Sequence, residues 1–134
     1  MNVLVIDGQG GGIGKQLVAS IKKNLPDTTV TAVGTNTIAT SAMMKAGADY
    51  AATGENAVIV NSRRADIITG PIGIVIADSL LGEITADMAN AVAKSNAKRI
   101  LIPVNHCNNI VVGVNDLSIN KLLQDVIMEI EKGH

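Results

Sequence analysis

The chain has 134 residues and a net charge of −1, and 47% of its residues are apolar. This length predicts one domain over residues 1–134, and the apolar content excludes a disordered chain. The near-neutral charge and the 1% aromatic content argue against nucleic-acid binding, which needs basic surfaces and stacking platforms. The sequence has no apolar run of membrane-spanning length, no N-terminal signal-peptide pattern and only one cysteine, so we expect a cytoplasmic protein with no membrane partner.

The first fifteen residues predict a strand, a glycine loop and a helix. The apolar run at 3–6 ends in Asp7, and five glycines follow within positions 8–14. Glycines let a backbone turn sharply and let a phosphate approach without meeting a Cβ atom. The helix that follows directs free N–H groups and its positive dipole end at the loop. We therefore expect the loop to bind a nucleotide-like anion. The expected contacts are Gly8, Gln9, Gly10, Gly11, Gly12, Ile13, Gly14 and Lys15.

Strands and helices alternate along the rest of the chain. We expect strands at 30–33, 48–52, 66–69, 100–104 and 110–114, and helices at 37–46, 54–64, 85–94 and 117–132. Thr37 and Thr85 are the expected caps of two of these helices. The segment 71–82 fits a helix or a buried strand, and we favour a helix because Pro71 suits a first helical position. Continuous apolar strands alternating with helices indicate a compact Rossmann-like three-layer α/β fold with a mostly parallel sheet.

In such a fold the ligand lies beyond the carboxyl ends of the strands, near the point where the strand order reverses. The loops expected to meet there are 7–14, 34–37, 70–73 and 105–109. They add five expected cofactor contacts, namely Thr35, Asn36, Gly70, Pro71 and Asn105.

The glycine spacing points to a family of cofactor loops. The pattern G-x-x-x-G-x-G fits Gly8, Gly12 and Gly14. Over roughly the first 35 residues the chain therefore resembles the cofactor loop of short-chain dehydrogenases/reductases, which implies NAD or NADP. The catalytic Tyr-x-x-x-Lys of that family is missing, because Gly54 stands four positions after Tyr50. Positions 34–37 offer no acidic residue for the ribose hydroxyls, which favours NADP slightly over NAD.

A P-loop for ATP or GTP is the alternative interpretation. Gly14 and Lys15 fit the end of G-x-x-x-x-G-K-[ST], although Gln16 replaces the hydroxyl residue that would hold Mg²⁺. An apolar run that ends at Asp78 resembles the acidic residue that closes a strand in P-loop proteins. Lys15 and Asp78 would be the functional residues of this alternative.

Two polar clusters are candidates for chemistry. His106 and Cys107 follow the strand expected at 100–104, where His106 is a candidate proton-transfer residue and Cys107 a candidate nucleophile. A buried, inert cysteine is the commoner case. Asp78 and Glu83 would serve acid–base chemistry if they act as a pair, or would act as a local cap and a solvated carboxylate if they do not. Neither cluster identifies a catalytic site.

The whole chain also resembles a small family of uncharacterised bacterial proteins of similar length. The shared segments are D-G-Q-G-G-G-I-G at 7–14, G-T-N at 34–36, G-P-I-G at 70–73 and I-P-x-N at 102–105. This resemblance implies no activity. We expect a nucleotide- or dinucleotide-binding protein that acts as a ligand-responsive module or a small oxidoreductase. We also expect a homodimer centred on 71–82 or on the C-terminal helix, because the apolar content exceeds what one thin sandwich buries.

Overall fold

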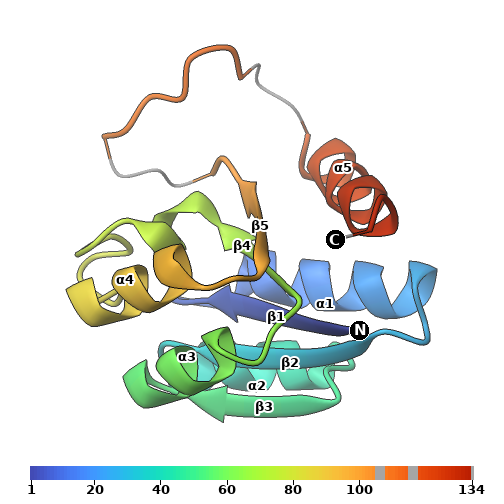
Figure 1. Ribbon diagram of the computed structural model, residues 1–134, viewed down its shortest axis with the longest axis horizontal. Helices are drawn as coiled ribbons and strands as arrows, with labels where there is room; N and C mark the ends of the chain where they lie inside the picture. Colours follow the sequence, from blue (N-terminus) through green and yellow to red (C-terminus); the bar gives the residue numbers. More distant parts are fainter. Residues whose placement is uncertain (105–107, 115–117, 134) are drawn as a thin grey trace.

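The computed structural model describes residues 1–104, 108–114 and 118–133 (Figure 1). The elements are β1 (Asn2–Asp7), α1 (Gly12–Asn24), β2 (Thr29–Gly34), α2 (Thr37–Lys45), β3 (Tyr50–Thr53), α3 (Glu55–Ser62), β4 (Ile67–Pro71), the 3₁₀ helix η1 (Ile72–Val75), α4 (Ala86–Lys94), β5 (Lys98–Ile102) and α5 (Ile119–Glu131). The alternation of strands and helices expected from the sequence is thus present.

The strands form one parallel sheet in the order β3-β2-β1-β4-β5. The chain leaves β1 for β2 and β3 on one side, and then crosses to β4 and β5 on the other side. The strand order therefore reverses between β1 and β4. In doubly wound folds, ligands bind beyond the carboxyl ends of the two strands at this switch point. The Rossmann-like fold class is confirmed.

Helices cover both faces of the sheet and bury the two sides of β1 separately. Val3 and Val5 pack in a cluster with apolar residues of α1, α2 and α5. Leu4 and Ile6 pack in a second cluster with residues of α3, η1 and α4. Successive side chains of a strand point to opposite faces, so the central strand is apolar on both sides. This arrangement gives three layers and leaves the strand ends free to carry polar loops.

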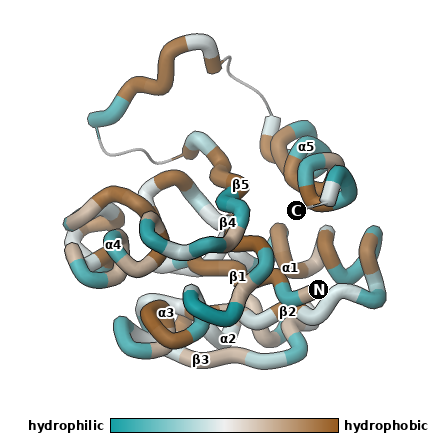
Figure 2. The backbone as a smooth tube through the Cα atoms, viewed as in Figure 1, coloured by the Kyte–Doolittle hydropathy of each residue, from teal (hydrophilic) through white to brown (hydrophobic). Residues whose placement is uncertain are grey.

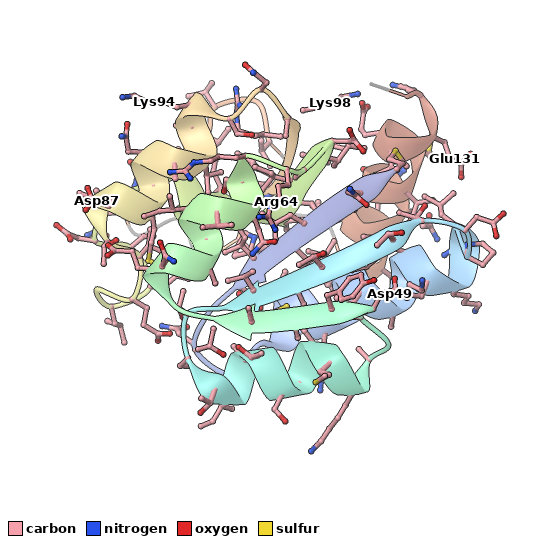
Figure 3. The ribbon with its side chains drawn as sticks, turned by 60° about the horizontal axis from the view of Figure 1, so that its bottom comes forward. Asp49, Arg64, Asp87, Lys94, Lys98 and Glu131 are labelled. Carbon is pink, nitrogen blue, oxygen red and sulfur yellow. The ribbon has the colours of Figure 1, made fainter. Side chains whose placement is uncertain are left out.

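Side chains at the helix ends fix where several helices begin. Asn36 caps α2 by accepting a hydrogen bond of 2.9 Å from the Ala39 N–H, one residue before the expected cap at Thr37. Thr85 caps α4, as expected from the sequence. Asp87 and Lys94 lie at opposite ends of α4 (Figure 3), where their charges complement the helix dipole.

Two elements expected from the sequence are absent. The segment 71–82 is no α-helix, because β4 runs through Pro71 and η1 is followed by turns. No strand forms within the described residues 108–114, which extend away from the sheet (Figures 1 and 2). Ile110 and Val112 are 87% and 92% exposed there. Gly113 and Val114 instead line a hollow beside β5 and α5 without joining the sheet.

Candidate functional site

Asp7 ends β1 at the switch point and holds both ends of the glycine loop. Its Oδ1 accepts a hydrogen bond of 2.8 Å from the Gly8 N–H, and its Oδ2 accepts one of 2.6 Å from the Gly14 N–H. Burial raises the pKa of Asp7, and the hydrogen bonds from Gly14 and Gly8 only partly oppose this shift. The charge of Glu83 adds to the rise. Asp7 is therefore a structural brace for the loop.

Three of the five loop glycines are required by packing inside the protein. A Cβ atom on Gly8 would lie 2.6 Å from Thr35 Oγ1, and one on Gly14 would lie 2.8 Å from the Cβ atom of Asp7. Gly11 has a φ of 72°, which favours glycine, and its Cβ would lie 2.8 Å from the Ala39 Cα atom. These glycines would be needed whether or not the loop binds a ligand.

The other two glycines have no such internal reason. A Cβ atom on Gly10 or on Gly12 would meet nothing within 4 Å, and neither residue has a positive φ. Gly12 is the first residue of α1. Within the residues that the structure describes, the N–H groups of Gly10 and Gly12 donate no hydrogen bond. The loop thus presents open backbone donors at a helix N-terminus.

Glu83 connects the glycine loop to the loop between β2 and α2. Its Oε1 atom accepts hydrogen bonds from the Gln9 N–H at 2.9 Å, from Asn36 Nδ2 at 2.7 Å and from the Thr35 hydroxyl. Asn36 Nδ2 also donates to the Gln9 carbonyl at 3.0 Å. Burial alone would raise the pKa of Glu83, but the hydrogen bonds from Thr35, Gln9 and Asn36 outweigh it and lower the pKa. Sequence reasoning did not place Glu83 in this site.

Lys15 and Ile13 lie on different sides of α1. The Lys15 side chain is exposed, and it lines an open groove between α1 and α2 together with Thr37, Ser41 and Lys45. This groove carries two lysines, with Lys15 in the first turn of α1 and Lys45 at the C-terminal end of α2. Ile13 is partly buried and packs against the apolar cluster beneath α1, so its side chain supports the loop from inside.

Two of the expected cofactor contacts, Gly70 and Pro71, lie at the end of β4. Gly70 and Pro71 are buried, and a Cβ atom on Gly70 would collide with the carbonyl oxygen of Ile6. Gly70 is therefore needed for the close approach of β4 to β1.

Asp78 does not end a strand, because it lies exposed in a turn and its N–H donates to the Ile84 carbonyl at 2.7 Å. The acidic strand end of a P-loop protein is missing at this position.

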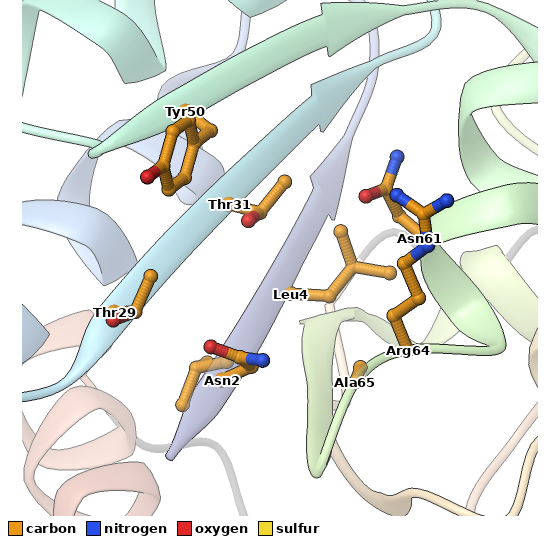
Figure 4. A pocket seen from close by; sticks show the side chains of 9 residues that line it. Asn2, Leu4, Thr29, Thr31, Tyr50, Asn61, Arg64 and Ala65 are labelled. Carbon is orange, nitrogen blue, oxygen red and sulfur yellow. The ribbon is translucent and has the colours of Figure 1, made fainter.

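A separate hollow of about 350 Å³ lies at the opposite end of the strands (Figure 4). Tyr50 stands on one side of it, and Asn61 and Arg64 approach from the end of α3 (Figure 4). Thr31 and Leu4 lie between these groups. Ligands of parallel α/β sheets bind at the carboxyl ends of the strands. This hollow at the amino ends is therefore distinct from the expected nucleotide site.

Three of the candidate residues follow the end of β5. Asn105, His106 and Cys107 lie outside the described residues. In the described part of the chain, His, Cys, Asp and Glu side chains form no group of three that could hold a metal ion. None of the helices in that same part combines the length and apolarity that crossing a lipid bilayer requires.

A comparison with curated proteins found no match. A comparison with solved structures found the crystal structure of a dodecameric FMN-dependent UbiX-like decarboxylase from Escherichia coli O157:H7. That structure is similar to this chain with a TM-score of 0.49 and 17% sequence identity, over 98% of this chain and 76% of the other.

The expectation of NAD or NADP is wrong. The solved structure found by comparison is named for FMN, and not for a nicotinamide cofactor. The geometry supplies a physical reason within this chain. Thr35 and Asn36, which were expected to bind the ribose, instead donate to the carboxylate of Glu83. In this structure the two donors expected for the ribose are thus occupied by a carboxylate of the protein itself.

The family is shown by a match that spans almost the whole chain. The matching family model covers residues 2–134 and so includes the glycine loop, the β2–α2 loop and Glu83. This agrees with the expected membership of an uncharacterised family. The chain belongs to the family described as Domain of unknown function (DUF3842).

Proposed function

We propose that this chain binds a phosphate-bearing ligand of the nucleotide class at the carboxyl end of β1. The observation that carries the proposal is the open space over Gly10 and Gly12. Internal packing explains Gly8, Gly11 and Gly14 but leaves these two glycines unexplained. A glycine in a loop costs backbone entropy on folding. A ligand that approaches the backbone closely accounts for both positions.

The electrostatics around the loop favour an anion at this place. The first turn of α1 contains no acidic residue of its own, and the Asp7 carboxylate uses the N–H of Gly14 while the N–H groups of Gly10 and Gly12 stay open. Backbone N–H groups at a helix N-terminus bind phosphate groups in many folds. The exposed Lys15 stands one turn into α1 and has no ion-pair partner among the described residues. Its flexible side chain can reach a phosphate bound at the loop.

We propose a binding role because the carboxylates beside the loop already serve the protein's own structure. Asp7 uses both oxygens to hold the loop, and Glu83 uses Oε1 to hold three donors. The chain would then act as a ligand-responsive module, whose two loops rearrange when the ligand binds.

Calorimetric titration with ATP, FMN and inorganic pyrophosphate tests the proposal. In Gly12→Val a branched side chain would occupy the place of the phosphate, so we expect affinity to fall by about 100-fold or more. Gly12→Ala adds one methyl group and should lie between wild type and Gly12→Val. Thermal unfolding checks that each variant is folded. The proposal fails if wild type binds none of the three ligands, or if Gly12→Val binds as tightly as wild type.

A further inference from the structure

The carboxylate of Glu83 occupies hydrogen-bond donors that a phosphate would use. We infer that Glu83 is an internal competitor for the ligand's anionic group, and that a ligand binds fully only when this carboxylate moves away. The inference rests on the proposed function, because it concerns the same glycine loop. It adds a regulatory element to that site and identifies the kind of ligand that can displace Glu83.

The contacts of Glu83 are those of a bound anion. Its Oε1 atom accepts from a backbone N–H, an amide NH₂ and a hydroxyl, and these donors come from the two loops that follow β1 and β2. The Gln9 N–H belongs to the glycine loop itself, and Gln9 has a φ of 50°, in the left-handed region that residues with a side chain seldom adopt. The same atom lies 3.0 Å from where a Cβ on Gly8 would stand. The carboxylate therefore sits directly over the loop.

The loop that carries Glu83, residues 76–84, has a closed base and a strained tip. Its base is held by the hydrogen bond of 2.7 Å from the Asp78 N–H to the Ile84 carbonyl, and Ile84 is fully buried. The side chain of Glu83 can therefore rotate away from the glycine loop while the backbone at the base of this loop stays in place.

The tip stores backbone strain close to Glu83. Asp78, Leu80 and Leu81 have φ values of 65°, 54° and 56°, which are uncommon for residues with bulky side chains. Leu81 is 94% exposed, whereas Leu80 is buried, and the Glu83 N–H donates to the Leu80 carbonyl at 3.2 Å. Strain of this kind persists only where surrounding contacts impose it, and it is typical of ligand clamps. The hydrogen bonds of Glu83 are among the contacts that hold this conformation.

Competition with the Glu83 carboxylate determines which class of ligand can bind. If a neutral hydroxyl group of a ligand took the place of the Glu83 carboxylate, the donors would form weaker hydrogen bonds. Hydrogen bonds to ionised groups are roughly twice as strong as neutral ones. A phosphate or pyrophosphate group offers several charged oxygens and can take over the donors of Gln9, Thr35 and Asn36. A ligand that binds without displacing Glu83 would place two negative charges side by side. We therefore expect a multiply charged phosphoryl group to be the part of the ligand that opens the site.

Titration of inorganic pyrophosphate into wild type and three variants tests this inference. Glu83→Gln keeps the shape but removes the charge, and Glu83→Ala also removes the contacts. Glu131→Gln is the matched control, because it makes the same change of net charge at the exposed C-terminal end of α5. We expect pyrophosphate to bind about tenfold more tightly to Glu83→Gln than to wild type, since like charges side by side are costly. Glu83→Ala should bind at least as tightly as Glu83→Gln, and Glu131→Gln should match wild type.

The Gln9 amide resonance in a ¹⁵N–¹H spectrum gives a second measurement on the same samples. In wild type, pyrophosphate should move this resonance, and the free Glu83→Ala protein should already lack the shift that the carboxylate causes. If wild type binds pyrophosphate in a Gly12-dependent way and neither Glu83 variant binds it more tightly, the inference is wrong and the proposed function stands. If neither wild type nor any Glu83 variant binds pyrophosphate, both are wrong. Dispersed spectra show that the variants are folded.

Discussion

Gln9 and Glu83 are 74 residues apart in the sequence, and the Gln9 N–H donates a hydrogen bond of 2.9 Å to the Glu83 carboxylate. This bond joins the loop after β1 to the loop before α4, across the point where the strand order reverses. Asn36 takes part from the third loop, by donating to the same carboxylate oxygen at 2.7 Å. One side chain, that of Glu83, thus connects the three loops that surround the switch point.

The stability of glycine variants should separate the two kinds of loop glycine. Gly14→Ala is expected to lower the free energy of unfolding by about 1–3 kcal/mol, the usual cost of overpacking a tight site. The added methyl group would lie 2.8 Å from the Cβ atom of Asp7. Gly12→Ala should stay within about 0.5 kcal/mol of wild type, because its surroundings are open and surface changes have small effects. Urea unfolding followed by circular dichroism measures both. Equal losses of unfolding free energy in the two variants would contradict this division of the glycines into packed and open positions.

The contribution of Glu83 to stability should depend on pH with a definite sign. Its pKa is lowered from an ordinary value of 4.5, so its ionised form stabilises the fold above that pH. This contribution is lost as the pH falls through the lowered pKa. We expect Glu83→Gln to be less stable than wild type by on the order of 1 kcal/mol at neutral pH, an amount limited by solvent screening. The difference should shrink below pH 4.5.

Asp7 changes the stability with pH in the opposite direction, in wild type and in Glu83→Gln alike. Its pKa is raised from 3.8, so stability falls as the pH rises from that value through the raised pKa. Subtracting the unfolding free energies of wild type and Glu83→Gln at each pH therefore isolates most of the Glu83 contribution. A difference that grows as the pH falls from 5 to 3 would contradict the assignment.

Ligand binding should not require Mg²⁺. Asp78 lies in an exposed turn and does not end a strand, so the acidic partner of a P-loop metal is missing. Backbone N–H groups and the dipole of α1 hold the phosphate in this account. Affinity for ATP should therefore be equal with Mg²⁺ and with a chelator, and Lys15→Ala should weaken it by only about tenfold, the effect of losing one flexible charge. Strict Mg²⁺ dependence with complete loss in Lys15→Ala would favour a P-loop mechanism.

Assembly into a homodimer stays a prediction. The structure moves the expected centre of the interface to the segment that contains Ile110 and Val112. The apolar face of α5 already packs in the core through Leu123, Val126, Ile127 and Ile130, so α5 has little left for a partner. Ile110 and Val112 are 87% and 92% exposed, and exposed apolar patches commonly mark interfaces. Light scattering should report about twice the chain mass of 13.8 kDa.

One double variant and one single variant locate the interface. Ile110→Asp with Val112→Asp should convert the dimer into a monomer. Leu81→Asp changes the 94% exposed leucine in the segment first expected to form the centre, and it should leave the dimer intact. A monomeric wild type would contradict the assembly, and dissociation by Leu81→Asp alone would return the interface to 71–82.

The sequence predicted the sheet well because local signals agreed with the fold. Apolar runs such as 3–6 are buried on both faces, and a doubly covered parallel sheet requires continuous apolar strands. The segment 71–82 misled the analysis, because its apolar residues serve a 3₁₀ turn and a loop in which Leu80 is buried and Leu81 is exposed. No helical or strand period describes such a loop. The run at 110–114 was misjudged because its apolar residues suit a buried strand, whereas Ile110 and Val112 lie exposed in a loop.

Only part of the candidate site could be predicted from the sequence. The glycine loop follows from residue spacing, but spacing does not show which glycines face open space and which face Thr35, Ala39 or Asp7. Glu83 belongs to the site through contacts with residues 47, 48 and 74 positions away. No local pattern carries such long-range contacts, because they depend on the strand order, and a turn carboxylate looks like an ordinary solvated residue.

The most direct test of the binding site is a map of backbone amide shifts as inorganic pyrophosphate is added to ¹⁵N-labelled protein. The account predicts that the largest changes occur at Gly10 and Gly12, with Gln9 following as Glu83 moves away. Amides around the hollow at the amino ends of the strands, at Thr31 and Tyr50, should not change. Shifts centred on Thr31 and Tyr50, with Gly10 and Gly12 unmoved, would place the ligand at the wrong end of the sheet and contradict the account.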